Sequence, residues 1–277
     1  MKLFRLEGNR IGIIDNDTWY DVTDALGIDT GAWPPTQMVT FIAEFDKHRG
    51  SILSNPATRK IAPAKNKLVT PIEWPNKLLC YPANYQKHRE EMNSSNRADK
   101  NKFFLKANSS LSGPNDPIVM PGLAGRSTHH ECELGIIIGK KGRRISRENC
   151  WDYIFGYTCL IDVVVRGDEE RVWRKSWDSF CPNGPWITLA EEVPNPTELN
   201  LKLWVNGELR QSANTRDLLL DIPGMIAVAS EAATLYPGDI IATGTPEGVG
   251  PIEAGDNVRI WVEHVGEMNI KVIAHDA

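Results

Sequence analysis

The segment "ECELGIIIG", residues 131–139, constrains the fold more strongly than any other part of this sequence. Its apolar run from Leu134 onward predicts a buried strand, yet two glutamates stand where that strand begins. Because residues i and i+2 of a strand share a face, Glu131 and Glu133 point the same way and Cys132 faces the other side as packing. Two buried carboxylates without a counter-charge are unfavourable. The segment is therefore either a solvated strand end or one side of a cation site.

A third acid, Asp162, stands in another apolar run, "GYTCLIDVVVRG". It is either a structural hydrogen-bond acceptor or a third ligand beside Glu131 and Glu133. Three carboxylates would make an all-oxygen site, which suits a hard divalent ion such as Mg²⁺ or Mn²⁺. His129 and His130 are alternative ligands that would favour zinc, but we expect them to lie behind the ligands or at the surface.

The segment "NYQKHREEM" contains a histidine and a glutamate three residues apart. On a helix, His88 and Glu91 share a face, so the carboxylate orients the imidazole and raises its basicity. Such a pair deprotonates water near neutral pH, although a surface helix with a simple charge contact has the same spacing. The polar stretch 93–102 has no apolar periodicity and predicts a loop that orders over a ligand.

Two lysines and one glycine-rich segment are further candidates for binding an anion. Lys106 follows three apolar residues and Lys175 lies among aromatic ones, so each either binds a carboxylate or oxyanion or reaches solvent. The segment 242–250, "ATGTPEGVG", lacks both nucleotide-binding glycine motifs. Its amides and the Thr245 hydroxyl suit a small carboxylate, or the segment simply connects two strands.

The remaining patterns predict an α+β, β-rich protein without internal repeats. Asn206-Gly207 between two strand-like runs indicates a hairpin. We expect helices after the Pro34-Pro35 break, over 146–157 with Ser146 as N-cap, and over 221–235 with Asp221 as N-cap. The first 70 residues predict a small N-terminal domain of short strands, and residues 71–277 predict a larger domain.

The composition excludes several classes of protein. A net charge of −5 over 277 residues argues against nucleic acid as a partner. No apolar run approaches the roughly 20 residues that span a bilayer, and the polar start is a poor signal peptide. Five scattered cysteines without a CxxC pair exclude a zinc ribbon and fit a reducing compartment, so we expect a cytoplasmic protein.

Seen together, these segments resemble the fumarylacetoacetate hydrolase family. The matching stretches occur in the family's order, cover about residues 77 to 275, and are "NYQKHREEM", "FFLKANSSLSGP", "HHECELGIIIGK", "DYIFGYTCLIDVVVR", "KSWDSFCPNGPW", "WVNGELRQSANT", "LYPGDIIATGTPEGVG" and "AGDNV". The resemblance implies a partly rolled mixed sheet, a homodimer, and a Mg²⁺ or Mn²⁺ site. It places the metal ligands at Glu131, Glu133 and Asp162, the catalytic residues at His88, Glu91 and Lys106, and substrate-binding residues at Tyr85, Lys175, Gln211 and Thr245.

One segment departs from the family's pattern. The family commonly has Asn-Asp-Val-Ser-Ala-Arg-Asp around the third ligand, whereas this chain has Ile-Asp-Val-Val-Val-Arg-Gly over 161–167. The ligand and Arg166 are kept, while the flanking Asn, Ser and second Asp are not, unless Asp168 replaces the last. The difference bears on the substrate more than on the metal.

The resemblance implies a hydrolase that uses a divalent metal to cleave a carbon–carbon bond in an acylpyruvate or related 2-oxo acid, in the breakdown of aromatic compounds. In that mechanism His88, oriented by Glu91, activates water, and Lys106 stabilises the oxyanion. Decarboxylation or tautomerisation of a 2-oxo diacid such as oxaloacetate remains open, because it needs the same stabilised enolate. A non-catalytic homologue that binds metal or carboxylate is the third alternative.

Overall fold

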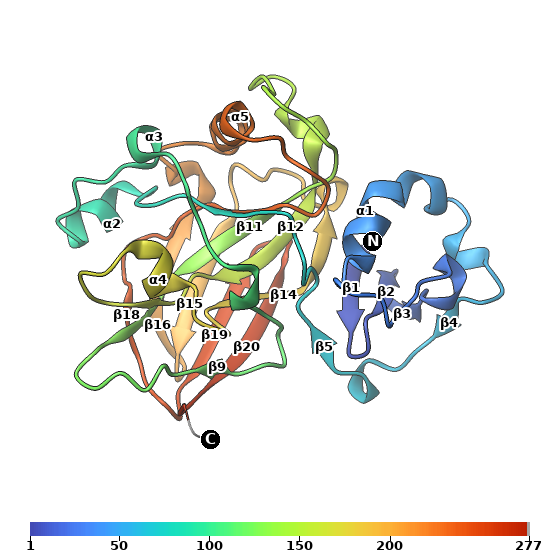
Figure 1. The fold of residues 1–277 in the computed structure, drawn as a ribbon, viewed down its shortest axis with the longest axis horizontal. Coiled ribbons are helices and arrows are strands. Elements are labelled where there is room, and N and C mark those ends of the chain that lie inside the picture. Colours follow the sequence, from blue (N-terminus) through green and yellow to red (C-terminus); the bar gives the residue numbers. More distant parts are fainter. Residues whose placement is uncertain (276–277) are drawn as a thin grey trace.

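The computed structural model describes residues 1–275. The main element of the described fold is a sheet of 12 strands (Figure 1). Ten of these strands, in order across the sheet, are β4 (Arg59–Lys60), β3 (Thr18–Asp21), β2 (Arg10–Asp15), β1 (Lys2–Leu6), β14 (Cys181–Leu189), β12 (Ile154–Ile161), β11 (Cys132–Ile138), β17 (Ile240–Ala242), β6 (Leu78–Cys80) and β7 (Phe104–Leu105). The other two are β5 (Leu68–Val69), paired with β1, and β8 (Leu111–Ser112), paired with β14. The β17–β6 and β14–β8 pairs are parallel and the β11–β12 pair is antiparallel, so the sheet is mixed.

Two smaller sheets and short helices complete the described fold. One sheet contains β16 (Glu208–Asn214), β15 (Asn200–Val205), β19 (Asn257–Val262), β20 (Gly266–Ile273) and β9 (Ile118–Val119), and the other contains β13 (Val164–Val165), β10 (Thr128–His130) and β18 (Gly250–Ile252). The α-helices are α1 (Gln37–His48), α2 (Gln86–Glu91), α3 (Ala98–Asn101), α4 (Arg171–Lys175) and α5 (Ile222–Ala232). The predicted α+β, β-rich fold with a mixed sheet is confirmed.

Strand β11 is buried on both faces because its side chains enter two different cores. Leu134 packs in a core that also contains Leu203 of the five-stranded sheet. Ile137, on the opposite face, packs in a core that also contains Phe41 of α1. An apolar run without alternation is expected of a strand that lies between two layers.

The N-terminal strands continue the large sheet. Strands β1, β2 and β3 form an antiparallel meander, and β1 pairs with β14 through Lys2–Thr188 and Leu3–Ile187. These elements lie at one end of the molecule, with α2 and α4 at the other (Figure 1). The division into domains 1–70 and 71–277 stays a prediction.

Most predicted elements are present, and one is not. The hairpin at Asn206-Gly207 joins β15 to β16, and both turn residues have the positive φ that such a turn requires, 52° and 83°. Asp221 caps α5 by accepting a 3.0 Å hydrogen bond from the Gly224 amide. The helix predicted over 146–157 is wrong, because only a 3₁₀ turn at Cys150–Tyr153 precedes β12. Pairing with β11 on one side and β14 on the other satisfies the backbone there.

Two further expectations concern helices and cysteines. No helix within residues 1–275 is long and apolar enough to cross a membrane. All five cysteines are free thiols and all are buried. Cys132 packs in the main core, on the side away from Glu133, as its place in the strand predicted.

Candidate active site

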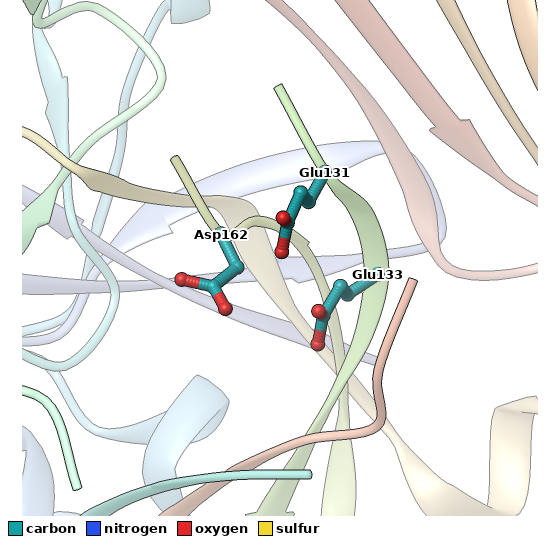
Figure 2. Close-up of side chains that lie close together, drawn as sticks. All are labelled: Glu131, Glu133 and Asp162. Atoms are coloured by element: carbon teal, nitrogen blue, oxygen red, sulfur yellow. The ribbon is translucent and has the colours of Figure 1, made fainter. Parts of the chain in front are cut away.

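The three predicted metal ligands lie together at one end of β11 and β12 (Figure 2). Glu133 belongs to β11, whereas Glu131 lies between β10 and β11, where the chain passes from the three-stranded sheet to the large sheet. Asp162 directly follows β12, and its amide donates a 2.9 Å hydrogen bond to the Glu131 carbonyl. The antiparallel pairing of β11 with β12 therefore brings the third acid beside the first two.

These three residues, Glu131, Glu133 and Asp162, form what we call the carboxylate cluster. One carboxylate oxygen of each lies within 4.8 Å of the others. The residues are only 5%, 2% and 2% exposed, so water cannot screen their mutual repulsion. Carboxylate oxygens are the ligands that Mg²⁺ and Mn²⁺ prefer, and a buried set converging from two strands fits either ion.

Three basic side chains contact the carboxylate cluster. Lys175 Nζ lies 2.6 Å from both Glu131 Oε2 and Asp162 Oδ2. Lys106 Nζ donates a 2.6 Å hydrogen bond to the other oxygen of Asp162. Arg166 forms an ion pair with Glu131 at 3.2 Å. This network of charges fixes the orientation of Glu131 and Asp162, while Glu133 accepts a 2.8 Å hydrogen bond from the Gly244 amide.

The two glutamates differ in how well their charge is compensated. Burial alone would raise the pKa of Glu131, but Lys175 and Arg166 lower it to about 2. Burial and the charge of Asp162 raise the pKa of Glu133 well above its usual range. Glu133 is therefore the member of the cluster that gains most from a further positive charge.

The predicted His–Glu pair forms on α2. His88 Nδ1 lies 3.2 Å from Glu91 Oε2, and His88 is buried. The other oxygen of Glu91 accepts a 2.9 Å hydrogen bond from the Gly248 amide. The glycine-rich segment 242–250 thus holds the carboxylate that orients the imidazole.

A cavity of about 430 Å³ lies over the carboxylate cluster. Besides the cluster, its lining includes His88, Phe104, Arg166, Gly167, Arg171, Arg174, Lys175 and Thr245. Four predicted site residues are not among those that line it, namely Tyr85, Glu91, Lys106 and Gln211. The structure therefore gathers the metal ligands, the histidine, one lysine and Thr245 around a single space.

Gln211 lies behind Thr245 and is saturated with hydrogen bonds. Its Nε2 donates to Thr245 Oγ1 at 2.8 Å and to the Pro246 carbonyl at 2.9 Å. Its Oε1 accepts from the Cys132 amide at 2.9 Å and lies 3.0 Å from His130 Nδ1. These partners fix the amide orientation, so His130 carries its proton on Nδ1. His130, which was expected to lie behind the ligands or at the surface, therefore ties Gln211 to the end of β10, directly before Glu131.

Tyr85 and Lys106 are also held away from the cavity. The Tyr85 hydroxyl is buried and has no hydrogen-bond partner among the described residues. Lys106 donates to the Phe180 carbonyl at 2.8 Å as well as to Asp162, and is 4% exposed. Of the two predicted lysines, Lys175 is the one that faces the cavity.

The segment 161–168, which departs from the family's pattern, packs against the side chain of Arg126. A Cβ atom at Gly167 would lie 1.6 Å from a terminal nitrogen of Arg126. That guanidinium donates to the Arg166 carbonyl at 2.8 Å and forms two hydrogen bonds with Glu169, at 2.7 and 2.6 Å. Asp168, considered above as a replacement for the missing acid, is exposed. The glycine therefore makes room for an arginine that braces the chain leading into α4.

Sequence reasoning missed the two arginines of α4, Arg171 and Arg174, which line the cavity beside Lys175. The available signal was the spacing of Arg171, which lies three residues before Arg174 and four before Lys175, since residues three and four apart share a helix face. The exposed Val172 and Trp173 between them obscured the pattern.

A buried, all-oxygen cluster at the end of paired strands, with a histidine beside it, defines a candidate metal-dependent enzyme. The chain belongs to the fumarylacetoacetate hydrolase family, because the profile described as "Fumarylacetoacetate (FAA) hydrolase C-terminal" matches residues 77–273. This match covers the larger part of the chain and includes every predicted site residue.

Relatives with names or solved structures extend the likeness to the whole chain. Maleylpyruvate hydrolase of Aquipseudomonas alcaligenes is 39% identical, over 98% of this chain and 99% of that protein. The crystal structure of maleylpyruvate hydrolase from Sphingobium sp. SYK-6 in complex with manganese(II) ion and pyruvate is 51% identical, with a TM-score of 0.90 over 99% of both chains. The mitochondrial oxaloacetate tautomerase FAHD1 of Mus musculus is 36% identical over 72% of this chain and 93% of that protein.

Proposed function

We propose that this protein is a divalent-metal-dependent hydrolase that cleaves the carbon–carbon bond of an acylpyruvate, giving pyruvate and the acid of the acyl group. The observation that carries the proposal is the carboxylate cluster and His88 lining one cavity. The Mn²⁺ and pyruvate held by the Sphingobium relative support it.

The carboxylate cluster is the proposed site of Mg²⁺ or Mn²⁺. When bound, the cation supplies a Lewis acid that polarises the carbonyl of the 2-oxo acid. Lys175, Lys106 and Arg166 orient Glu131 and Asp162, and the Gly244 amide holds Glu133 by a 2.8 Å hydrogen bond.

The chain's own residues carry the proton transfers. His88, oriented by Glu91, takes a proton from water, and the hydroxide adds to the distal carbonyl carbon of the acyl group. The bond between that carbon and the methylene then breaks, and its electron pair passes to the pyruvate enolate. His88 returns the proton to the methylene carbon, so one water is consumed and two acids are released.

The oxyanion formed in this reaction needs a nearby donor. The family resemblance implies Lys106 for this role, but Lys106 does not line the cavity and its Nζ donates to Asp162 and to the Phe180 carbonyl. Lys175 does line it and has one N–H beyond the two that contact carboxylates. We therefore assign the oxyanion to Lys175 and the positioning of Asp162 to Lys106.

Decarboxylation or tautomerisation of a 2-oxo diacid is the second candidate, and the likeness to the mouse oxaloacetate tautomerase favours it. The His88–Glu91 pair favours hydrolysis, because only hydrolysis needs an activated water. Incubating the protein with acylpyruvates and with oxaloacetate, in Mg²⁺ or Mn²⁺, and resolving products by mass separates the reactions. Hydrolysis gives two acids without CO₂, and decarboxylation gives CO₂, whereas tautomerisation leaves the mass unchanged and is followed by the loss of the enol absorbance of oxaloacetate.

The proposal also covers the oligomeric state, the cellular location and the metabolic role of the protein. We infer a homodimer, a cytoplasmic location and a role in the breakdown of aromatic compounds. The five buried free thiols support a reducing compartment. Light scattering after size exclusion tests the dimer.

A further inference from the structure

Two arginines of α4 line the cavity without a carboxylate partner. Arg171, Arg174 and Lys175 all reach the cavity wall. Lys175 is paired with the carboxylate cluster, whereas neither arginine forms an ion pair with any carboxylate in the described part of the chain. Guanidinium groups that line a cavity unpaired are candidate anion-binding groups.

The contacts of the two arginines leave their terminal nitrogens available. The guanidinium of Arg171 lies over the Phe104 ring, 5.1 Å from its centroid, and Arg174 donates only its Nε, to the Glu169 carbonyl at 2.8 Å. Both side chains are partly buried. Burial and the charge of Arg174 lower the pKa of Arg171, although a guanidinium stays protonated in any protein. Two neighbouring cations repel each other, and an anion between them removes that repulsion.

The charges at the cavity floor are already matched. The cluster holds three carboxyl groups, and three cations, Lys175, Lys106 and Arg166, form ion pairs with two of them, Glu131 and Asp162. Arg171 and Arg174 are therefore additional, and a divalent cation makes the cavity more positive still. The single carboxylate of a 2-oxo acid does not balance this excess of positive charge.

The position of Arg171 suits the far end of an acyl group. Arg171 is four residues before Lys175, which places it about 6 Å further along the helix axis. A four-carbon acyl chain that starts at the cluster covers a similar length. The Arg126–Glu169 pair, which Gly167 admits, braces the chain just before α4.

We propose that Arg171 and Arg174 bind a second carboxylate at the far end of the acyl group, so that the preferred substrate is an acylpyruvate carrying two carboxylates. This inference rests on the proposed function. Guanidinium and carboxylate match as a planar, two-bonded pair, which gives selectivity over an uncharged acyl end. Maleylpyruvate, in the names of two relatives, is one acid of this kind.

The test compares succinylpyruvate with butanoylpyruvate, which differ only in a terminal carboxylate or methyl group. In the wild type, kcat/KM is higher for succinylpyruvate. In Arg171→Gln and Arg174→Gln, the ratio of the two kcat/KM values falls about 10- to 100-fold, the loss expected for a charged hydrogen bond. Arg143→Gln removes an exposed arginine that does not line the cavity and leaves the ratio unchanged. If a glutamine variant does not fold, Arg171→Lys replaces it in the same comparison, because lysine keeps the charge but lacks the planar pair of guanidinium donors.

If kcat/KM falls by the same factor for both substrates in Arg171→Gln and Arg174→Gln, the inference is overturned, because the arginines then contact a group that both substrates share. A wild type that prefers butanoylpyruvate overturns it as well. If neither substrate is cleaved, the proposed function fails, and titration calorimetry of the Mg²⁺-loaded protein still decides the inference. Succinate must then bind more tightly than butanoate, with the difference lost in Arg171→Gln, and equal affinities contradict it.

Discussion

The ammonium nitrogen of Lys175 lies 2.6 Å from a carboxylate oxygen of Glu131, and both side chains are buried. Breaking a buried pair of this kind leaves a charge without its partner, which costs about 3 kcal/mol. We expect Lys175→Met, measured in chelator, to lower the free energy of unfolding by about that amount. The metal-free protein therefore depends on this lysine for stability.

The same variant should respond more strongly to metal. Mn²⁺ competes with the Lys175 ammonium for the carboxylates, so it should stabilise Lys175→Met more than the wild type in urea denaturation. Lys87→Met changes an exposed lysine and is the matched control. Equal stabilisation of the variant and the wild type by Mn²⁺ would mean that the cation does not share these carboxylates with Lys175.

His88 and Glu91 should act on kcat rather than on metal affinity. Removing a general base costs about 10²- to 10⁴-fold, so we expect His88→Ala to lose at least 10²-fold in kcat while calorimetry still shows Mn²⁺ binding. Glu91→Gln keeps an acceptor for the Gly248 amide but orients the imidazole less strongly, and should lose less. Glu90→Gln, the same change at an exposed position of α2, is the control. Full activity in His88→Ala would refute the role of the pair.

Gln211 should contribute to the stability of the fold as well as hold the Thr245 hydroxyl in place. Gln211→Leu removes the hydrogen bonds to Thr245 and Pro246 and leaves the Cys132 amide and His130 unpaired in the core. Each buried group left unpaired costs about 1–3 kcal/mol, so we expect the free energy of unfolding to fall by at least about 2 kcal/mol. A leucine variant as stable as the wild type would mean that the network carries no energy.

The cysteines should be inert in the folded protein. Burial raises the pKa of Cys150 to about 11, so almost none of this thiol is thiolate at pH 8. The other four thiols are buried as well. A disulfide reagent at pH 8 should therefore label fewer than one cysteine per chain before unfolding and five after it. Fast labelling of a native thiol would show that the core opens there.

The local geometry of the carboxylate cluster could be predicted from the sequence, but its assembly could not. Strand alternation placed Glu131 and Glu133 on one face, and they do converge (Figure 2). Asp162 joins them only because β12 pairs with β11, and no pattern within either strand specifies its partner. The resemblance to the fumarylacetoacetate hydrolase family, whose segments occur here in the same order, is what indicated that Asp162 joins the two glutamates.

The errors have a common physical cause, which is that long-range contacts override local signals. Residues 146–157 have a helical start signal, yet β12 begins inside that segment because neighbouring strands are available on both sides. Lys106 and Gln211 have the polar character of pocket residues, but buried partners at Asp162 and Thr245 hold them behind the cavity. Neither outcome can be derived from the residues next to them in the chain.

The most direct test of the central claim is the metal dependence of one cleavage reaction. The purified protein is incubated with an acylpyruvate and Mn²⁺, and pyruvate and the second acid are quantified by mass. We predict the two acids in equal amounts, no CO₂, loss of turnover in chelator with recovery on adding Mn²⁺, and no recovery in Glu133→Gln. Cleavage that continues in chelator, or full Mn²⁺-dependent activity in Glu133→Gln, would contradict a hydrolase built on the carboxylate cluster.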